Sequence, residues 1–380
     1  MMNGLLLLLA TALGAMLGYL GRRRRSDAVE STHRCHPDYF RGLDLLLNER
    51  PDDALQVFIN LAEQEPRTIE PLLALGALYR RRGETEQAVR IHQGLLSRPG
   101  MGEGDRGRVL LELGRDYRAI GWLDRAEDMF RELLAQAEHA GEARLNLLEI
   151  YEQWRSWPQA VEIAETLARE TGVGCWRERQ AHLLAQQASD ALKSADEASA
   201  ERLIRQALDV EPSLPRALIV LARLARQKGD CASALALYAR MEETAPEFVG
   251  LVLEDWQACV GDGDAWLVIL ERLTARRPSL AIAEARAQAL KAQGRLAEAI
   301  GVLHAHYLAR PGRAALERFL AFAVECREPG PVLATWRAQH ASVPAPLAYR
   351  CEKCGLHGET LHWQCPSCRA WGSVKPVEAP

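Results

Sequence analysis

Strand-forming residues are scarce in this 380-residue chain, and positive charge is not in excess. Alanine, leucine, arginine, glutamate and glutamine dominate, which predicts an all-α protein. The net charge is −4, and it becomes more negative still when the four consecutive arginines Arg22–Arg25 are set aside. The main body is therefore not expected to bind nucleic acid. The length exceeds what one compact core usually supports, so several units or one elongated solenoid are expected.

A disulfide framework is also missing from the pattern of the nine cysteines. An odd total, with four cysteines packed as two pairs near the C-terminus, indicates a reducing compartment and a metal site. The sequence contains no nucleotide-binding loop, no zincin helix and no nucleophile elbow. We therefore predict no catalytic residue and do not expect an enzyme.

The N-terminus carries one apolar run, from Gly4 to Gly21, without a charged residue. Eighteen helical residues span about 27 Å, near the lower limit for crossing a bilayer. Because Arg22–Arg25 follow directly, the positive-inside rule places the body on the cytoplasmic side. A cleaved signal peptide is the alternative, but its basic residues would precede the run. We expect a transmembrane anchor over residues 1–21 and a basic juxtamembrane linker over 22–37.

An internal repeat runs through the middle of the chain. Its marker is a small residue, once replaced by tryptophan, and successive markers are 34, 38, 34, 40, 34, 32 and 33 residues apart. The markers are Ala54, Ala88, Ala126, Ala160, Ala200, Ala234, Trp266 and Ala299. A period near 34 is that of the tetratricopeptide repeat (TPR), a helix–turn–helix unit. We predict a superhelical TPR solenoid of about eight to nine helical hairpins over residues 38–342, with a concave face that binds a partner protein.

Other residues keep fixed offsets from the markers. Gly42, Gly76 and Gly114 each lie twelve residues before a marker, where a small residue lets the two helices approach closely. Five prolines lie twelve residues after a marker and are expected to end the second helix: Pro66, Pro212, Pro246, Pro278 and Pro311. The fourth unit, with Leu148 at the small position, and the seventh unit, with Glu254 there, are weak, and their helices are expected to slip by a turn. Residues 313–341 predict a capping helical pair, and residues 100–107 predict a glycine-rich loop.

Two C-x-x-C pairs, Cys351 with Cys354 and Cys365 with Cys368, lie ten residues apart near the C-terminus. Four thiolates from two tight turns can surround one tetrahedral metal ion. Gly355 permits the left-handed backbone that such a turn often needs. Because the protein fills all four positions, the site is predicted to be structural. A domain this small, residues 347–376, has almost no core, so the ion is expected to hold its fold.

The identity of the ion stays open between zinc and iron, since both suit four thiolates. A thioredoxin-type redox dithiol is the alternative, but it would be a single pair on a helix within a βαβ unit. His357 and His362 are expected near the site or on the surface rather than as ligands. Trp363 and Trp371 are expected to pack the small domain or to dock it on the last repeat.

Three stretches resemble the lipopolysaccharide assembly protein B (LapB) family. They are DYFRGLDLLL (38–47), LGRDYRAIGWLDRAEDMF (113–130) and the cysteine segment 349–375 with its CPSCRAW motif. The order of anchor, TPR array and rubredoxin-like metal knuckle is also similar to that family. Residues 171–346 match only as repeats.

The resemblance implies an inner-membrane adaptor that regulates lipopolysaccharide biosynthesis through proteolysis. Such proteins bring LpxC, the deacetylase that commits material to lipid A, to the membrane protease FtsH. The resemblance assigns Cys351, Cys354, Cys365 and Cys368 to a single iron or zinc ion. Other membrane proteins of the pathway are further candidate partners, and the partner-binding residues of the concave face are not identified.

Two competing functions remain at this point. The first is a general TPR scaffold for envelope assembly complexes without a protease partner. The second is an enzyme in which the knuckle is an electron-transfer centre, and reversible iron redox in a coloured protein would indicate it.

Overall fold

The computed structural model describes residues 36–66, 68–326 and 348–377. The chain divides into two compact units, residues 1–150 and 151–380. Among the described residues, no helix combines the length and apolar character that a membrane span requires. The expected anchor over residues 1–21 and most of the basic linker lie outside the described residues.

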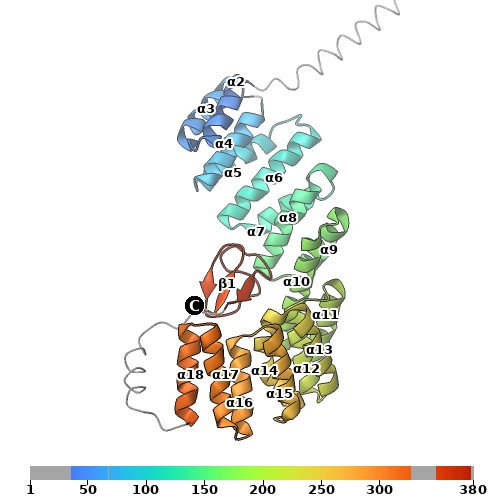
Figure 1. Cartoon of the computed structure of the whole chain (residues 1–380). Coiled ribbons are helices and arrows are strands. Elements are labelled where there is room, and N and C mark those ends of the chain that lie inside the picture. Colours follow the sequence, from blue (N-terminus) through green and yellow to red (C-terminus); the bar gives the residue numbers. More distant parts are fainter. Residues whose placement is uncertain (1–35, 67, 327–347, 378–380) are drawn as a thin grey trace, which may run out of the picture. The chain divides into compact units, whose positions relative to one another are not determined.

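The first unit consists of helices that pair as antiparallel hairpins (Figure 1). They are α2 (Pro37–Leu47), α3 (Pro51–Gln64), α4 (Glu70–Arg81), α5 (Thr85–Leu96), α6 (Glu103–Ile120), α7 (Leu123–Leu133) and α8 (Ala137–Trp154). Helix α8 continues into the second unit.

The second unit continues the helical hairpins and ends in a small sheet. Its first helices are α9 (Trp157–Thr171), α10 (Gly174–Lys193), α11 (Glu197–Val210), α12 (Pro215–Gln227) and α13 (Cys231–Thr244). The 3-10 helix η1 (Pro246–Leu251) follows, and then α14 (Leu253–Val260), α15 (Asp264–Arg276), α16 (Leu280–Ala292), α17 (Leu296–Ala309) and α18 (Arg313–Cys326). The strands are β1 (Tyr349–Cys351), β2 (His357–Gly358) and β3 (Val374–Pro376). The chain is therefore mostly helical, as predicted, with strands only in the knuckle among the described residues.

The repeat markers lie on the second helix of each hairpin, from α3 to α17. All eight, including Trp266, are 0% exposed. The glycines at the offset of twelve face the ring that lies four residues after the marker. A Cβ on Gly42 would lie 2.6 Å from the Phe58 ring, and one on Gly114 would lie 2.7 Å from the Phe130 ring. The close helix approach predicted from these glycines is therefore confirmed, since any larger residue would collide with the ring.

The second hairpin replaces this ring by a buried histidine, which the repeat pattern did not predict. His92 lies against Gly76, and its Nδ1 is 2.5 Å from the Asp116 carboxylate. Arg80 contacts Asp116 and Glu112, each at 2.6 Å. These pairs compensate for burying a carboxylate that is 0% exposed. The network joins helices α4, α5 and α6.

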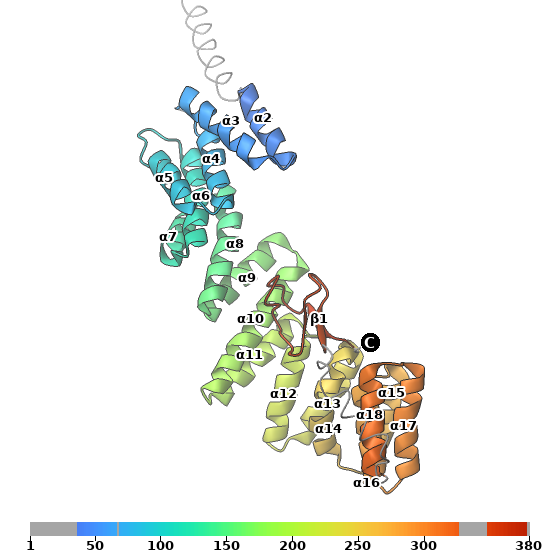
Figure 2. The ribbon, with the colours of Figure 1, turned by 90° about the vertical axis from the view of Figure 1, so that its left-hand side faces the viewer.

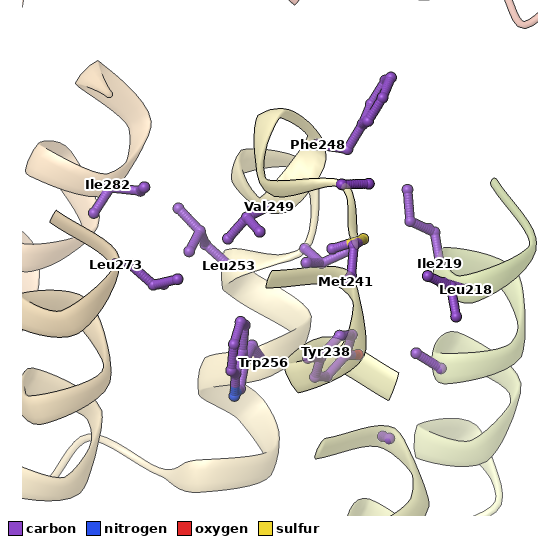
Figure 3. Close-up of a cluster of buried hydrophobic side chains, with 14 of the residues drawn as sticks. Leu218, Ile219, Tyr238, Met241, Phe248, Val249, Leu253, Trp256, Leu273 and Ile282 are labelled. Atoms are coloured by element: carbon purple, nitrogen blue, oxygen red, sulfur yellow. The ribbon is translucent and has the colours of Figure 1, made fainter. Parts of the chain in front are cut away.

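The weak seventh unit is irregular, as its sequence predicted, whereas the fourth, for which the same was expected, has two regular helices, α8 and α9. Its first helix is replaced by η1 and the eight-residue α14. Large side chains fill the space that the short helix leaves: Figure 3 shows Tyr238, Met241, Val249, Leu253 and Trp256 between α12 on one side and α15 and α16 on the other. The Trp256 ring stacks on Tyr238 at 5.4 Å and contacts Trp266 at 6.3 Å between ring centroids. A tryptophan at the marker position therefore compensates for a shortened hairpin.

The five prolines each lie two residues beyond the end of a helix, as expected; α17, for example, ends at Ala309 before Pro311.

The prediction of a glycine-rich loop over residues 100–107 is wrong for the C-terminal part of that segment, because helix α6 begins at Glu103. Gly107 is buried in that helix, where a Cβ would lie 2.4 Å from His139. The glycine serves close packing there rather than a turn. Of the predicted capping pair, α18 is described and the second helix lies outside the described residues.

Candidate metal centre

The two C-x-x-C turns of the knuckle have the same backbone geometry. The N–H of Cys351 donates to the carbonyl of Leu356, and the N–H of Cys365 donates to the carbonyl of Ala370, five residues ahead in both cases. Gly355 and Arg369, four residues after the first cysteine of each turn, donate back to that cysteine's carbonyl at 2.9 Å. Both have positive φ, +74° for Gly355 and +55° for Arg369. The left-handed position predicted at Gly355 is therefore present, and the second turn reaches it without glycine.

The turns bring the four predicted cysteines together. The sulfur atoms of Cys351, Cys354, Cys365 and Cys368 all lie within 4.8 Å of one another. The Sγ atoms of Cys351 and Cys368 are 3.7 Å apart, as are those of Cys354 and Cys365. A tetrahedral ion with metal–sulfur bonds of about 2.3 Å needs sulfurs about 3.8 Å apart. The spacing therefore fits one four-coordinate ion, with two cysteines buried and two exposed.

The surroundings of the sulfurs favour the thiolate at two of the four cysteines and oppose it at a third. The hydroxyl of Ser373 lies 3.3 Å from Cys351 Sγ and lowers the pKa of that thiol to about 6. The backbone N–H of Leu356 lowers the pKa of Cys354. Although the N–H of Ala370 acts in the same direction at Cys368, burial and the three neighbouring cysteines raise the pKa of that thiol to about 11. Four thiolates this close would repel one another, and a bound metal ion would supply the cation that lets all four sulfurs ionise.

A three-stranded antiparallel sheet holds the first turn. Its order is β2-β1-β3, with Tyr349 opposite Pro376 and Cys351 opposite Val374. The N–H of Glu352 donates to the carbonyl of Ser373 at 2.8 Å, which places the Ser373 hydroxyl beside Cys351. Strand β3 therefore holds the first C-x-x-C turn in place and positions the Ser373 hydroxyl beside the Cys351 sulfur.

The knuckle docks on the middle of the second unit through Trp371. In both views its strands lie beside α10 (Figures 1 and 2). The Trp371 ring stacks on His182 of α10 at 5.4 Å, and its Nε1 donates to Glu152 at 3.3 Å. Gln364 also donates to Glu152, whose carboxylate is held by Arg179 at 2.8 Å.

A second set of contacts joins the knuckle to η1. The Trp363 ring lies 5.5 Å from the Phe248 ring. Lys375 Nζ lies 2.9 Å from Glu247 and 5.3 Å from the centre of the Phe248 ring. Burial raises the pKa of Glu247, but the bond to Lys375 outweighs it and leaves the pKa below its ordinary value. The expectation that the tryptophans dock on the last repeat is therefore wrong: they bind α10 and η1, because their ring partners His182 and Phe248 lie there.

Comparison with known proteins supports both parts of this architecture. Residues 349–376 match the rubredoxin metal binding domain, and residues 72–107, 111–172 and 186–247 match tetratricopeptide repeats. Lipopolysaccharide assembly protein B of Escherichia coli strain K12 is 32% identical over 98% of each chain. The chain belongs to the lipopolysaccharide assembly protein B family. The family protein of Haemophilus influenzae is 28% identical, again over 98% of each chain. A solved tetratricopeptide repeat protein from Parabacteroides merdae is 15% identical, covers 76% of this chain and 99% of its own, and superposes with a TM-score of 0.36.

Within this LapB-family chain, the sequence located the four cysteines but not the residues that hold the knuckle in place. His182, Phe248 and Glu152 lie more than one hundred residues from the knuckle, and no spacing rule connects them to it. The two histidines of the knuckle stay outside the sulfur cluster: His362 contacts Thr360 at 3.0 Å, and His357 lies in β2. The one available signal was a pair of tryptophans in a domain too small to bury them.

Acid should weaken the second unit through His182. Burial, with a smaller contribution from Arg216, lowers the pKa of this histidine to about 3. The unfolded chain has the ordinary value of about 6.5, so it binds more protons between those values and stability is lost as pH falls through that window. From pH 7.5 to pH 5.0 we expect the free energy of unfolding in urea to fall by about 2 kcal/mol more in the wild type than in His182→Phe. Equal pH dependence in the two proteins would contradict this assignment.

Proposed function

We propose that the chain is an inner-membrane-anchored adaptor on the cytoplasmic side that regulates lipopolysaccharide biosynthesis by bringing LpxC to the FtsH protease. The observation that carries the proposal is family membership over almost the whole chain, with 32% identity to the Escherichia coli relative. A role in lipopolysaccharide assembly follows from that membership, and the two named partners extend it. The chain acts by binding rather than by catalysis, as stacked helical hairpins commonly do.

The molecule offers separate parts for the separate tasks. The apolar run at Gly4–Gly21 would hold the chain at the bilayer, where confinement raises its effective concentration beside a membrane protease. The helical hairpins supply the protein-binding surface. Cys351, Cys354, Cys365 and Cys368 would bind one zinc or iron ion, which supplies a structural cross-link between the two turns. Through Trp371 and Lys375, the knuckle then braces α10 and η1.

Co-purification tests the proposal directly. A tagged full-length chain, extracted from its own bacterium in mild detergent, is expected to retain both FtsH and LpxC on immunoblots. Deleting the gene should slow LpxC degradation and raise its steady-state level several-fold, and re-expression should restore it. A chain that retains other envelope proteins but not FtsH, in cells with normal LpxC turnover, would favour the general scaffold instead.

A further inference from the structure

An apolar stripe lies on the exposed side of helix α2. Its three side chains, Phe40, Leu43 and Leu47, are 61%, 36% and 84% exposed. Their spacing of three and four residues places them within an arc of about 60° on the helix surface. No other described helix carries more than two large apolar side chains that are as exposed as these. The stripe is therefore a local concentration of apolar surface that the first unit leaves uncovered.

The stripe is distinct from the face of α2 that binds the next helix. That other face contains Tyr39, whose ring lies 5.6 Å from the Phe58 ring of α3. It also contains Leu45 and Leu46, which pack on the cluster formed by Ala54 and Phe58. Figure 1 shows α2 as the first described helix of the unit, with α3 packed against it. Helix α2 is thus apolar on two sides, although a helix at the end of a repeat array normally has a polar outer face.

The next two hairpins of the unit do not continue the stripe. The corresponding repeat positions hold small or charged residues: Ala74, Ala77 and Arg81 in α4, and Glu112, Arg115 and Ala119 in α6. A partner protein that lies along several hairpins would need an apolar lining that continues from one hairpin to the next. An apolar lining that ends after α2 instead indicates contact with a surface that reaches only this end of the unit.

The bilayer is the apolar medium nearest to α2 along the chain. The apolar run of the sequence ends at Gly21 and α2 begins at Pro37, so the fifteen residues 22–36 separate them. Fifteen fully extended residues span at most about 50 Å, which keeps α2 close to a membrane that holds the run. This tether raises the effective concentration of the stripe at the lipid surface. The modest partitioning of three apolar side chains is then enough to hold them there.

Charge does not explain the stripe. Helix α2 carries one arginine, Arg41, against two aspartates, Asp38 and Asp44, and is slightly acidic. An acidic helix gains nothing from anionic lipid headgroups, so its contact with lipid would come from the insertion of apolar side chains. Such a contact should depend little on salt.

We propose that α2 lies on the bilayer surface, with Phe40, Leu43 and Leu47 inserted at the boundary between lipid headgroups and acyl chains. The proposal goes beyond the adaptor function and rests on it only for the membrane anchor. The anchor keeps the chain at the membrane, and the stripe fixes which side of the first hairpin faces the lipid.

Photocrosslinking of the full-length protein in lipid vesicles tests the proposal. p-Benzoylphenylalanine replaces Phe40 in one chain and Trp154, a 36% exposed aromatic residue at the end of α8, in another. The vesicles contain phosphatidylethanolamine and phosphatidylglycerol, and mass spectrometry counts the phospholipid adducts. We expect about tenfold more adducts at position 40 than at position 154, since burial of a large apolar side chain favours the inserted state by at least that factor. Adduct formation at position 40 should persist at about 0.5 M salt, where exposed charges are screened.

A charge placed in the stripe should abolish the contact. Leu47→Asp is expected to lower adduct formation at position 40 by about tenfold, because insertion would remove the carboxylate from water. Leu308→Asp is the matched control and should leave those adducts unchanged, since it makes the same substitution in the last turn of α17 at a side chain that is 65% exposed. Unchanged far-UV circular dichroism in both variants would show that they are folded.

Three results would each overturn the proposal. They are equal adduct formation at positions 40 and 154, adducts of position 40 with a second copy or another protein in place of lipid, and equal effects of Leu47→Asp and Leu308→Asp. Carbonate extraction separates these results from a failure of the anchor. A chain that stays in the membrane pellet without lipid adducts at position 40 keeps its anchor and lacks only this contact. A chain that is extracted into the supernatant lacks the anchor, which would overturn both this proposal and the membrane-anchored adaptor function.

Discussion

Replacing Cys351 and Cys354 together by serine should reduce the bound metal from one ion per chain to nearly none. The two sulfurs come from one turn, and serine hydroxyls are poor ligands for zinc or iron at neutral pH. Structural zinc supplies about 10–16 kcal/mol in small domains, far more than a three-stranded sheet of this size gains by packing. The knuckle should therefore unfold and release Trp371 and Trp363. Elemental analysis of the purified chain measures the metal, and near-ultraviolet circular dichroism follows the tryptophans.

The same variant should lose adaptor activity while staying in the membrane fraction with its helices intact. The far-ultraviolet signal comes mainly from α2 to α18, which have their own buried core. A double replacement of Cys175 and Cys231, which lie outside the knuckle, is the matched control and should change neither metal content nor LpxC levels. Normal LpxC turnover in cells that carry only the Cys351→Ser, Cys354→Ser chain would contradict the proposed role of the metal.

Replacing Trp266 by alanine should destabilise the second unit by about 3–5 kcal/mol, although alanine is the usual residue at this repeat position. Trp266 is 0% exposed and contacts Trp256 beside the shortened helix α14. The backbone there does not close over a small side chain, so the substitution leaves a cavity. The slightly better helix propensity of alanine, about 0.5 kcal/mol, does not compensate. Urea unfolding followed by circular dichroism measures the difference.

Val268, two residues along the same helix, supplies the control because its side chain is 62% exposed. Val268→Ala should change the free energy of unfolding by less than about 0.5 kcal/mol. If Trp266→Ala cost no more than Val268→Ala, the irregular unit would be able to close around the usual small residue, and the packing account of this hairpin would be wrong.

The sequence predicted the features that repeat or follow local rules. The buried markers from Ala54 to Ala299 were found because each hairpin repeats the same close contact about every 34 residues. The sulfur cluster was predicted because C-x-x-C spacing places two cysteine sulfurs in one tight turn, where both can bind the same ion. Such signals are local, and the fold satisfies them one hairpin or one turn at a time.

The sequence missed features that arise from contacts between distant segments. The stacking of Trp371 on His182 joins residues that are 189 positions apart in the sequence, so no repeat period or local motif predicts it. The His92 and Asp116 network was hidden because a histidine stands where the pattern expects an aromatic ring. Arg369 adopts a left-handed backbone at a position where glycine would be expected, since the tight turn and its hydrogen bond to Cys365 impose it.

Hydrogen–deuterium exchange of the full-length protein, before and after removal of the metal by a chelator, tests the central claim most directly. If the ion holds the knuckle and the knuckle braces the helices, metal removal should speed exchange in β1 and β3 and at their contacts in α10 and η1. Exchange in α4 to α6 of the first unit should stay the same. Slow exchange in β1 and β3 without metal, or unchanged protection at α10 and η1 once the knuckle has unfolded, would contradict the account.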